Sequence, residues 1–172
     1  GVAEKGGRRA GRRVSETGKK VWEFSGRVGD HETKVIMRLL AADPLELMLA
    51  CAGGNLDKIS ARWENKNYVG VVMVSGGYPD KYETGFEITG LEFEGPGDTM
   101  VFHAGTKLGA GGPSGPPLTA GGRVLTVVGG GDTLESARER AYSRLEQISF
   151  KGARWRRDIS SAANQAAARP TG

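Results

Sequence analysis

The sequence has little cysteine, and this shortage narrows the class of protein. Cys51 is the only thiol among 172 residues, so the sequence holds neither a disulfide framework nor a metal site built from several cysteines. No run is long and apolar enough to span a membrane, and the N-terminus lacks the apolar segment of a signal peptide. Gly1 rather than Met opens the sequence, which suggests a processed product or a fragment. We expect a cytoplasmic protein with no membrane partner.

Aromatic residues are absent from the basic start of the chain. Residues 1–20 contain seven Lys and Arg against two Glu, a net charge of +5, whereas the whole chain carries +4. The basic character therefore belongs to this segment alone. A phosphate-binding arm is possible in principle, but no side chain here can stack on bases, so nucleic acid is not an expected partner. We expect residues 1–16 to be a disordered tail, because they bury too little apolar surface to offset the entropy of ordering.

Two helices are predicted in the first third of the chain. Residues 33–40 place their apolar side chains on one stripe. Asp43 and Pro44 form a second helix start, with Asp43 as the cap and Pro44 in the first turn, and Gly53 with the next glycine supplies the stop. We interpret Met48 and Cys51 as core packing rather than as ligands. Apolar side chains recur on one face of this second helix. They are Leu45, Met48, Leu49 and Ala52.

The rest of the chain reads as short strands followed by one helix. Residues 68–74 form a β-branched run that suits a strand buried on both faces. Asp132 and Thr133 begin the last helix. Further strands are predicted at 20–24, 60–63, 86–91, 99–103 and 123–128, a glycine- and proline-rich hairpin tip at 107–122, and a buried helix face at Leu134, Ala137, Ala141, Leu145 and Ile148. This arrangement, without regular alternation of strand and helix, predicts an α+β fold.

Several short motifs follow one another along the chain in an informative order. They are VVMVSGGYP at 71–79, GFEITGL at 85–91, VFHAGT at 101–106, GGRVL at 121–125, ISF at 148–150 and RRDI at 156–159. Over about residues 17–160 the sequence resembles the C-terminal domain of the phosphoribosylamine–glycine ligases, also called glycinamide ribonucleotide synthetases. A set of motifs in sequence order is more specific than any one of them.

That family consists of ATP-grasp enzymes of purine biosynthesis, so the resemblance implies a reaction. In the implied reaction ATP phosphorylates the carboxylate of glycine, and 5-phosphoribosylamine attacks the glycyl phosphate. The products are glycinamide ribonucleotide, ADP and phosphate. ATP is therefore the implied co-substrate and Mg²⁺ or Mn²⁺ the implied cofactor, because such chemistry depends on neutralising the charge of the phosphates.

The resemblance also implies a division of the chain. Residues 17–58 would be the end of an ATP-grasp lobe, and residues 59–160 a small antiparallel-sheet domain of the rudimentary hybrid-motif type with flanking helices. Residues 161–172 would be a frayed tail. The family's N-terminal domain and ATP-grasp lobes should lie upstream, and residues 1–16 do not resemble them. We therefore expect those missing lobes to be partners and the isolated chain to be inactive.

A metal site is implied in residues 21–32, VWEFSGRVGDHE, which match the family pattern E-F-N-x-R-F-G-D-P-E. Glu23 and Ser25 stand at its two metal-ligand positions. The Glu23 carboxylate is a hard oxygen donor of the kind that Mg²⁺ prefers. Ser25 replaces the family's Asn with a shorter side chain. No glycine-rich phosphate loop or adenine pocket is recognisable, so no residue is assigned to nucleotide binding.

Three catalytic residues are implied by the same match: Arg27, Asp30 and Glu32. Arg27 would brace a phosphoryl or acyl-phosphate oxygen through two hydrogen bonds. Asp30 and Glu32 would receive an amine or a ribose hydroxyl, or hold Arg27 in place. The residues alone allow a plainer interpretation, in which Glu23 is a charged strand-edge residue. The other three would then be a surface ion-pair cluster of little energetic value.

Other functions stay open beside the ligase. A binding or scaffold module of the same fold, without chemistry, is favoured by the absence of Asn at Ser25. An ATP-grasp carboxylase relative is a second enzymatic choice. The motif from His103 to Thr106 and the glycine-containing loop at residues 75–79 disfavour it. An anion-binding protein that acts through the basic tail ranks last.

Overall fold

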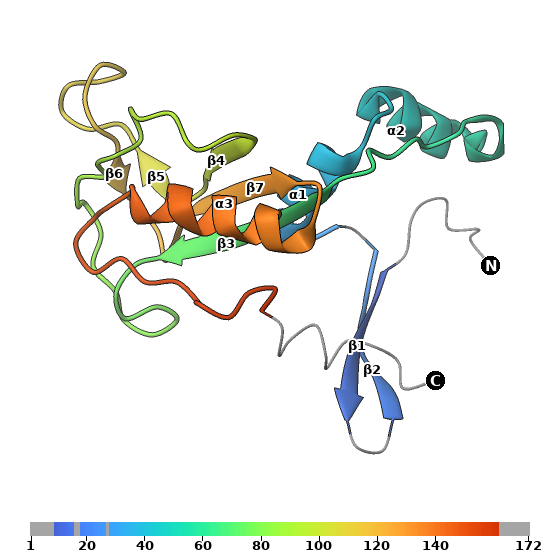
Figure 1. Cartoon of the computed structure of the whole chain (residues 1–172), viewed down its shortest axis with the longest axis horizontal. Helices are drawn as coiled ribbons and strands as arrows, with labels where there is room; N and C mark the ends of the chain where they lie inside the picture. The colour runs from blue at the N-terminus through green and yellow to red at the C-terminus, as the bar shows by residue number, and fades with distance from the viewer. Residues whose placement is uncertain (1–8, 16–17, 27, 162–172) are drawn as a thin grey trace. The chain divides into compact units, whose positions relative to one another are not determined.

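The structure, a computed structural model, divides into two compact units. The first comprises residues 1–65 with 161–172, and the second comprises residues 66–160. Each has its own set of helices and strands, which are labelled along the chain in Figure 1. The residues that the structure describes are 9–15, 18–26 and 28–161.

A β-hairpin forms the start of the first unit. β1, Arg9–Ser15, pairs antiparallel with β2, Gly18–Ser25, and β2 contains the strand predicted at residues 20–24. The prediction of a disordered tail was wrong for Arg9–Ser15. The hydrogen bonds of strand pairing satisfy the backbone N–H and C=O groups of this segment. Amino-acid composition does not show whether a segment has such a pairing partner. The rest of the predicted tail lies outside the described residues.

Two helices and a single turn of 3-10 helix follow in the first unit. α1 spans Asp30–Leu39, so it begins at Asp30 rather than at residue 33. α2 spans Pro44–Gly53, and the 3-10 turn η1 spans Leu56–Lys58. The strand predicted at residues 60–63 is reduced to an isolated bridge between Leu40 and Trp63.

The predicted ends of α2 are confirmed in atomic detail. The side chain of Asp43 accepts a hydrogen bond from Leu45 N at 2.8 Å, and Pro44 occupies the first helical position. Gly54 ends the helix with φ of 70°, a left-handed conformation that favours glycine. Local sequence signals therefore determine where this helix begins and ends.

The core position predicted for Met48 was wrong, whereas Cys51 is half-buried. Leu45, Met48 and Leu49 are 60%, 61% and 64% exposed, whereas Ala50 on the opposite side is 6% exposed. These large side chains do share one face, as their spacing predicts. The spacing of apolar residues shows which side chains share a helix face. Whether that face is buried depends on whether another part of the structure packs against it.

A three-stranded antiparallel sheet is the centre of the second unit. Its order is β3, Asn67–Val74; β7, Arg123–Gly131; and β4, Thr99–His103. β7 lies between the two others and is buried along nearly its whole length. β5, Thr106–Lys107, and β6, Leu118–Thr119, form a separate antiparallel pair at the base of the predicted glycine-rich hairpin.

The last helix, α3, Leu134–Glu146, packs along β3 and β7 (Figure 1). Ala137, Ala141 and Leu145 are 0% exposed, which confirms the predicted buried face at these positions. The helix approaches β7 closely at Gly129, where an added Cβ would lie 2.4 Å from Ala141 N and 2.5 Å from Ala137 O. Glycine at this position is therefore a condition of the helix–sheet contact.

The predicted α+β class is confirmed by these elements, with a further difference in the strands. Residues 86–91 form no strand and make only isolated bridges from Glu87 to Leu118 and from Thr89 to Ser149. Thr133 and Ser136 complete a capping box at the start of α3, as the sequence around Thr133 indicates. Within the described residues, the helices are all too short or too polar to cross a membrane.

Replacing Gly129 with alanine should lower the free energy of unfolding by about 1–3 kcal/mol, because overpacking forces α3 away from β7. Urea denaturation followed by circular dichroism measures this change. Gly26→Ala is the matched control, since a Cβ at Gly26 would meet nothing within 4 Å. Equal stability of the two variants would contradict the proposed close contact.

Candidate functional site

Two predicted site residues, Glu23 and Ser25, lie on β2, where their backbones pair with Gly11 and Arg9. Residues two apart on a strand share a face, so the backbone places both positions on the same side of the hairpin. Their side chains, and Arg27 as a whole, lie outside the described part of the structure. The metal pair and the phosphate-bracing role of Arg27 therefore stay predictions.

The donor types at positions 23 and 25 suit Mg²⁺ in kind. A carboxylate and a hydroxyl are both hard oxygen donors, and Mg²⁺ commonly takes one or two protein oxygens while phosphates and waters complete its shell. Among the residues that the structure describes, no group of three or more His, Cys, Asp or Glu is placed to hold a metal ion.

Asp30 and Glu32, the other predicted site residues, lie in the first turn of α1. Carboxylates are favourable there because the helix dipole is positive at its N-terminus. Asp30 Oδ2 accepts a hydrogen bond from Lys34 Nζ at 2.9 Å and lies 3.5 Å from His31 Nδ1. The Asp30 side chain is 56% exposed, whereas that of Lys34 is 11% exposed. Asp30 thus combines a local ion pair with a carboxylate that solvent can reach.

Three of the sequence motifs meet at one end of the sheet in the second unit. Ser75, after β3, donates its backbone N–H to Gly122 O at 2.8 Å and its hydroxyl to Gly121 O at 2.8 Å. Gly105, after β4, donates its N–H to Arg123 O at 2.8 Å, and Ala120 N–H returns a bond to Gly105 O at 2.7 Å. The loops 75–79, 103–106 and 119–123 are therefore one hydrogen-bonded cluster, which we call the loop cluster.

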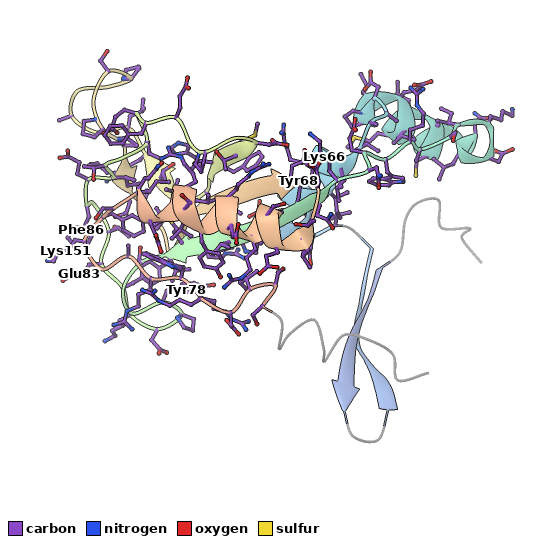
Figure 2. The ribbon with its side chains drawn as sticks, viewed as in Figure 1. Lys66, Tyr68, Tyr78, Glu83, Phe86 and Lys151 are labelled. Carbon is purple, nitrogen blue, oxygen red and sulfur yellow. The ribbon has the colours of Figure 1, made fainter. Side chains whose placement is uncertain are left out.

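Aromatic and titratable side chains surround the loop cluster. Tyr78 and Tyr82 are 39% and 41% exposed, and their ring centroids are 6.1 Å apart. His103 Nδ1 lies 3.0 Å from Thr106 Oγ1. Lys151 Nζ stands 4.7 Å from the centroid of the Phe86 ring and 4.0 Å from an oxygen of Glu83, and Figure 2 labels all three side chains.

Residues 75–79 form a turn between these contacts, and the sequence did not show which segments the turn meets. Strand order decides it, because β3 and β4 both pair with β7 and so bring their following loops to the strand's first residues. The motifs are far apart along the chain, and their meeting follows from the sheet alone.

Arg144 is a buried charge that the sequence analysis did not single out. It is 4% exposed, and its guanidinium donates to Gly90 O at 2.8 Å and to Gln147 Oε1 at 3.0 Å. Burial lowers the pKa of Arg144, and the charge of Glu92 partly offsets this effect. Its position three residues after Ala141 on α3 is a signal that could have placed it on the buried face.

An open groove of about 420 Å³ lies beside Arg144, with Leu91, Phe93 and Met100 among its lining residues. The guanidinium uses its N–H groups on the carbonyl of Gly90 and on Gln147, so it holds the loop before β4 in place. These hydrogen bonds give Arg144, beside the groove, a structural role.

Comparison with known proteins gives concordant results. Residues 68–162 match the family model described as phosphoribosylglycinamide synthetase, C domain. The chain is 42% identical over 160 residues to phosphoribosylamine–glycine ligase from Caldanaerobacter subterraneus subsp. tengcongensis, covering 93% of this chain and 37% of the relative. It is 43% identical over 140 residues to the bifunctional purine biosynthetic protein purD of Dictyostelium discoideum, covering 81% of this chain and 17% of the relative.

Solved structures extend the comparison to the fold. The crystal structure of phosphoribosylamine–glycine ligase from Thermotoga maritima matches with a TM-score of 0.71 and 35% identity, over 88% of this chain and 36% of that one. Urea carboxylase from Kluyveromyces lactis matches with a TM-score of 0.50 and 14% identity, over 88% of this chain and 13% of that one, which is a likeness of fold alone. The chain thus spans little more than a third of the length of the ligases that it resembles.

Removal of the Ser75 hydroxyl should loosen the loop cluster. We expect Ser75→Ala to lower the free energy of unfolding by about 1–2 kcal/mol. Ser75 is only 2% exposed, and loss of its hydroxyl deprives Gly121 O of a hydrogen-bond donor. Urea denaturation measures the effect. Thr89→Ala is the control, since the Thr89 hydroxyl lies 3.4 Å from Ser149 O at an exposed position and should matter by less than about 0.5 kcal/mol.

Proposed function

Because this chain belongs to the phosphoribosylglycinamide synthetase family through its C domain, we propose that it is the C-terminal part of a phosphoribosylamine–glycine ligase. The observation that carries the proposal is the extent of the sequence match. Identities of 42–44% to proteins with that name extend over 81–93% of this chain. Matches of this length include the loop cluster. The 160-residue match to the Caldanaerobacter ligase is longer than the second unit and therefore extends into the first.

The proposed reaction joins glycine to 5-phosphoribosylamine at the expense of ATP. The glycine carboxylate attacks the γ-phosphorus of ATP, which releases ADP and gives glycyl phosphate. The amine of 5-phosphoribosylamine then attacks the acyl carbon, phosphate leaves, and glycinamide ribonucleotide results. Protein groups mainly position the reactants and neutralise charge in such transfers. The chain would supply one wall of the site, and the remaining ligase sequence would hold ATP.

The residues proposed for this wall lie in and after β2. Glu23 and Ser25 would hold Mg²⁺ or Mn²⁺, which when bound neutralises charge on the transferring phosphoryl group. The shared face of these two positions on β2 supports the pairing. Arg27 would donate two hydrogen bonds to a phosphoryl or acyl-phosphate oxygen. Asp30 and Glu32 would accept hydrogen bonds from an amine or a ribose hydroxyl, and the exposure of Asp30 supports this role.

A scaffold without chemistry is the second candidate function. The specific observation in its favour is Ser25, which stands where the family pattern has Asn. A hydroxyl reaches less far than a side-chain amide and binds a cation more weakly. The two candidates differ in activity and share the fold.

A chimera distinguishes these candidates. In it, the matched region of the Caldanaerobacter ligase is replaced by this chain, and ADP release is measured with glycine, 5-phosphoribosylamine and Mg²⁺. We expect release that depends on both substrates in the chimera and none in the isolated chain. A chimera that unfolds cooperatively but releases no ADP would favour the scaffold, and release by the isolated chain would contradict the need for further lobes.

Within an active chimera, Glu23→Ala should reduce ADP release by more than about 100-fold. Mutation of residues that only hydrogen-bond to a metal ligand already lowers metal affinity or activity about 10–100-fold, and loss of the ligand itself should cost more. Ser25→Asn should raise the apparent affinity for Mg²⁺, since it restores the longer oxygen donor. Titration of ADP release with MgCl₂ measures both changes. Unchanged Mg²⁺ dependence in both variants would remove these residues from the metal site, and Gly26→Ala serves as the control for a change in the same segment.

A further inference from the structure

Helix α2 presents apolar side chains on two opposite sides. Toward its own unit lie Leu47, Ala50 and Cys51, of which Ala50 is 6% exposed and the other two are half-buried. The opposite side carries Leu45, Met48, Leu49 and Ala52, and the three large side chains are 60–64% exposed. Glu46 is the one charged residue of α2, and a helix that is otherwise apolar on opposite sides is normally enclosed in the core of a larger protein.

The exposed residues form one continuous stripe, which we call the α2 stripe. Leu45, Met48, Leu49 and Ala52 follow the i, i+3, i+4, i+7 spacing that aligns side chains along a helix. The stripe contains no charged residue, and Leu56 in η1, 47% exposed, adds a further apolar side chain beyond the end of the helix. Contiguous apolar surface of this kind marks a place where another protein surface packs.

We propose that the α2 stripe is the docking surface for the N-terminal part of the same ligase. This inference rests on the proposed function, because it takes that part as the partner. The relatives that match this chain carry most of their length outside the match, since the chain covers 37% of the Caldanaerobacter ligase and 36% of the Thermotoga structure. A large segment that belongs to the same polypeptide is therefore present in the relatives to cover the stripe.

The size of the stripe favours a tethered partner over a second copy of this chain. A ten-residue helix is about 15 Å long, so pairing two stripes would bury only a few hundred Å². Stable association of separate proteins buries about 1,200–2,000 Å². A covalently linked lobe needs no such area, because the link supplies a high effective concentration.

Thiol labelling in the isolated chain and in the chimera tests the docking surface. Met48→Cys in a Cys51→Ala background places a single thiol of this chain on the stripe, and Leu108→Cys in the same background is the control. Leu108 is 63% exposed, close to the 61% of Met48, and lies in the hairpin of the second unit. Peptide mapping by mass spectrometry gives the labelling rate at each position with a maleimide reagent.

We expect the thiol at position 48 to react at least tenfold more slowly in the chimera than in the isolated chain, and the thiol at position 108 to react equally in both. Equal rates at position 48 would overturn the proposal. Protection already present in the isolated chain would also overturn it, and sedimentation velocity would then show whether a second copy or the chain's own second unit covers the stripe. A chimera without cooperative unfolding would count against the proposal, because the stripe would then fail to receive the lobe.

A charged substitution gives an independent measurement. Leu49→Lys should lower the unfolding midpoint of the chimera by several degrees and leave that of the isolated chain unchanged, because Leu49 is exposed there. Leu108→Lys should change neither midpoint. An unchanged chimera would overturn the docking surface. Neither measurement reads ADP release, so an inactive chimera with a protected stripe would refute the proposed function while it supports the docking surface.

Discussion

The close contact between α3 and β7 is the constraint on which the second unit depends. β7 is the middle strand, so it pairs with both β3 and β4 and also supports the helix. Gly129 lets the helix backbone approach the strand, and Ala137 and Ala141 keep the facing side chains small. The rest of the core consists of larger apolar residues around this contact, among them Met73, Leu125 and Leu145. Dispersion contacts of this density depend on the fit between surfaces.

The loop cluster is a consequence of the same sheet. Two of its three motifs lie where β3 and β4 end, and the third lies where β7 begins, so the pairing of these strands brings the three motifs together. Ser75 then secures the cluster through Gly121 and Gly122. The motifs that reveal the family are thus largely the motifs that build this end of the domain. They identify the family more directly than they identify catalytic groups, and the proposed catalytic residues lie elsewhere, in and after β2.

The first unit differs in having helices whose apolar surface exceeds what the chain itself covers. The ends of α2 have complete local signals, and yet its largest side chains are exposed. The chain spans little more than a third of the Caldanaerobacter ligase, and in the proposed function further ligase sequence would cover this surface. Under that proposal, the exposed stripe and the need for further ligase sequence would have the same cause.

Much of the candidate site was beyond what the sequence alone could predict. The α+β class, both ends of α2, the start of α3 and the family resemblance were predicted correctly, and the roles of Glu23, Ser25, Arg27, Asp30 and Glu32 stay predictions. The partnership of Asp30 with Lys34 was not foreseen, although its one-turn spacing on α1 was a usable signal. Residues 86–91 were predicted as a strand but make only isolated bridges, because the ladder partners of such a run depend on distant segments.

By itself, the sequence determined the features that depend on neighbours along the chain. Asp43 and Gly54 bound α2, Thr133 caps α3, and the ordered motifs place the chain in its family, because each signal involves residues only a few positions apart or a match read in order. Only the tertiary structure decided that β7 is central, that Arg144 is buried and that the α2 stripe is exposed. These features depend on which surfaces meet, and that is set by packing between segments that are distant in the sequence.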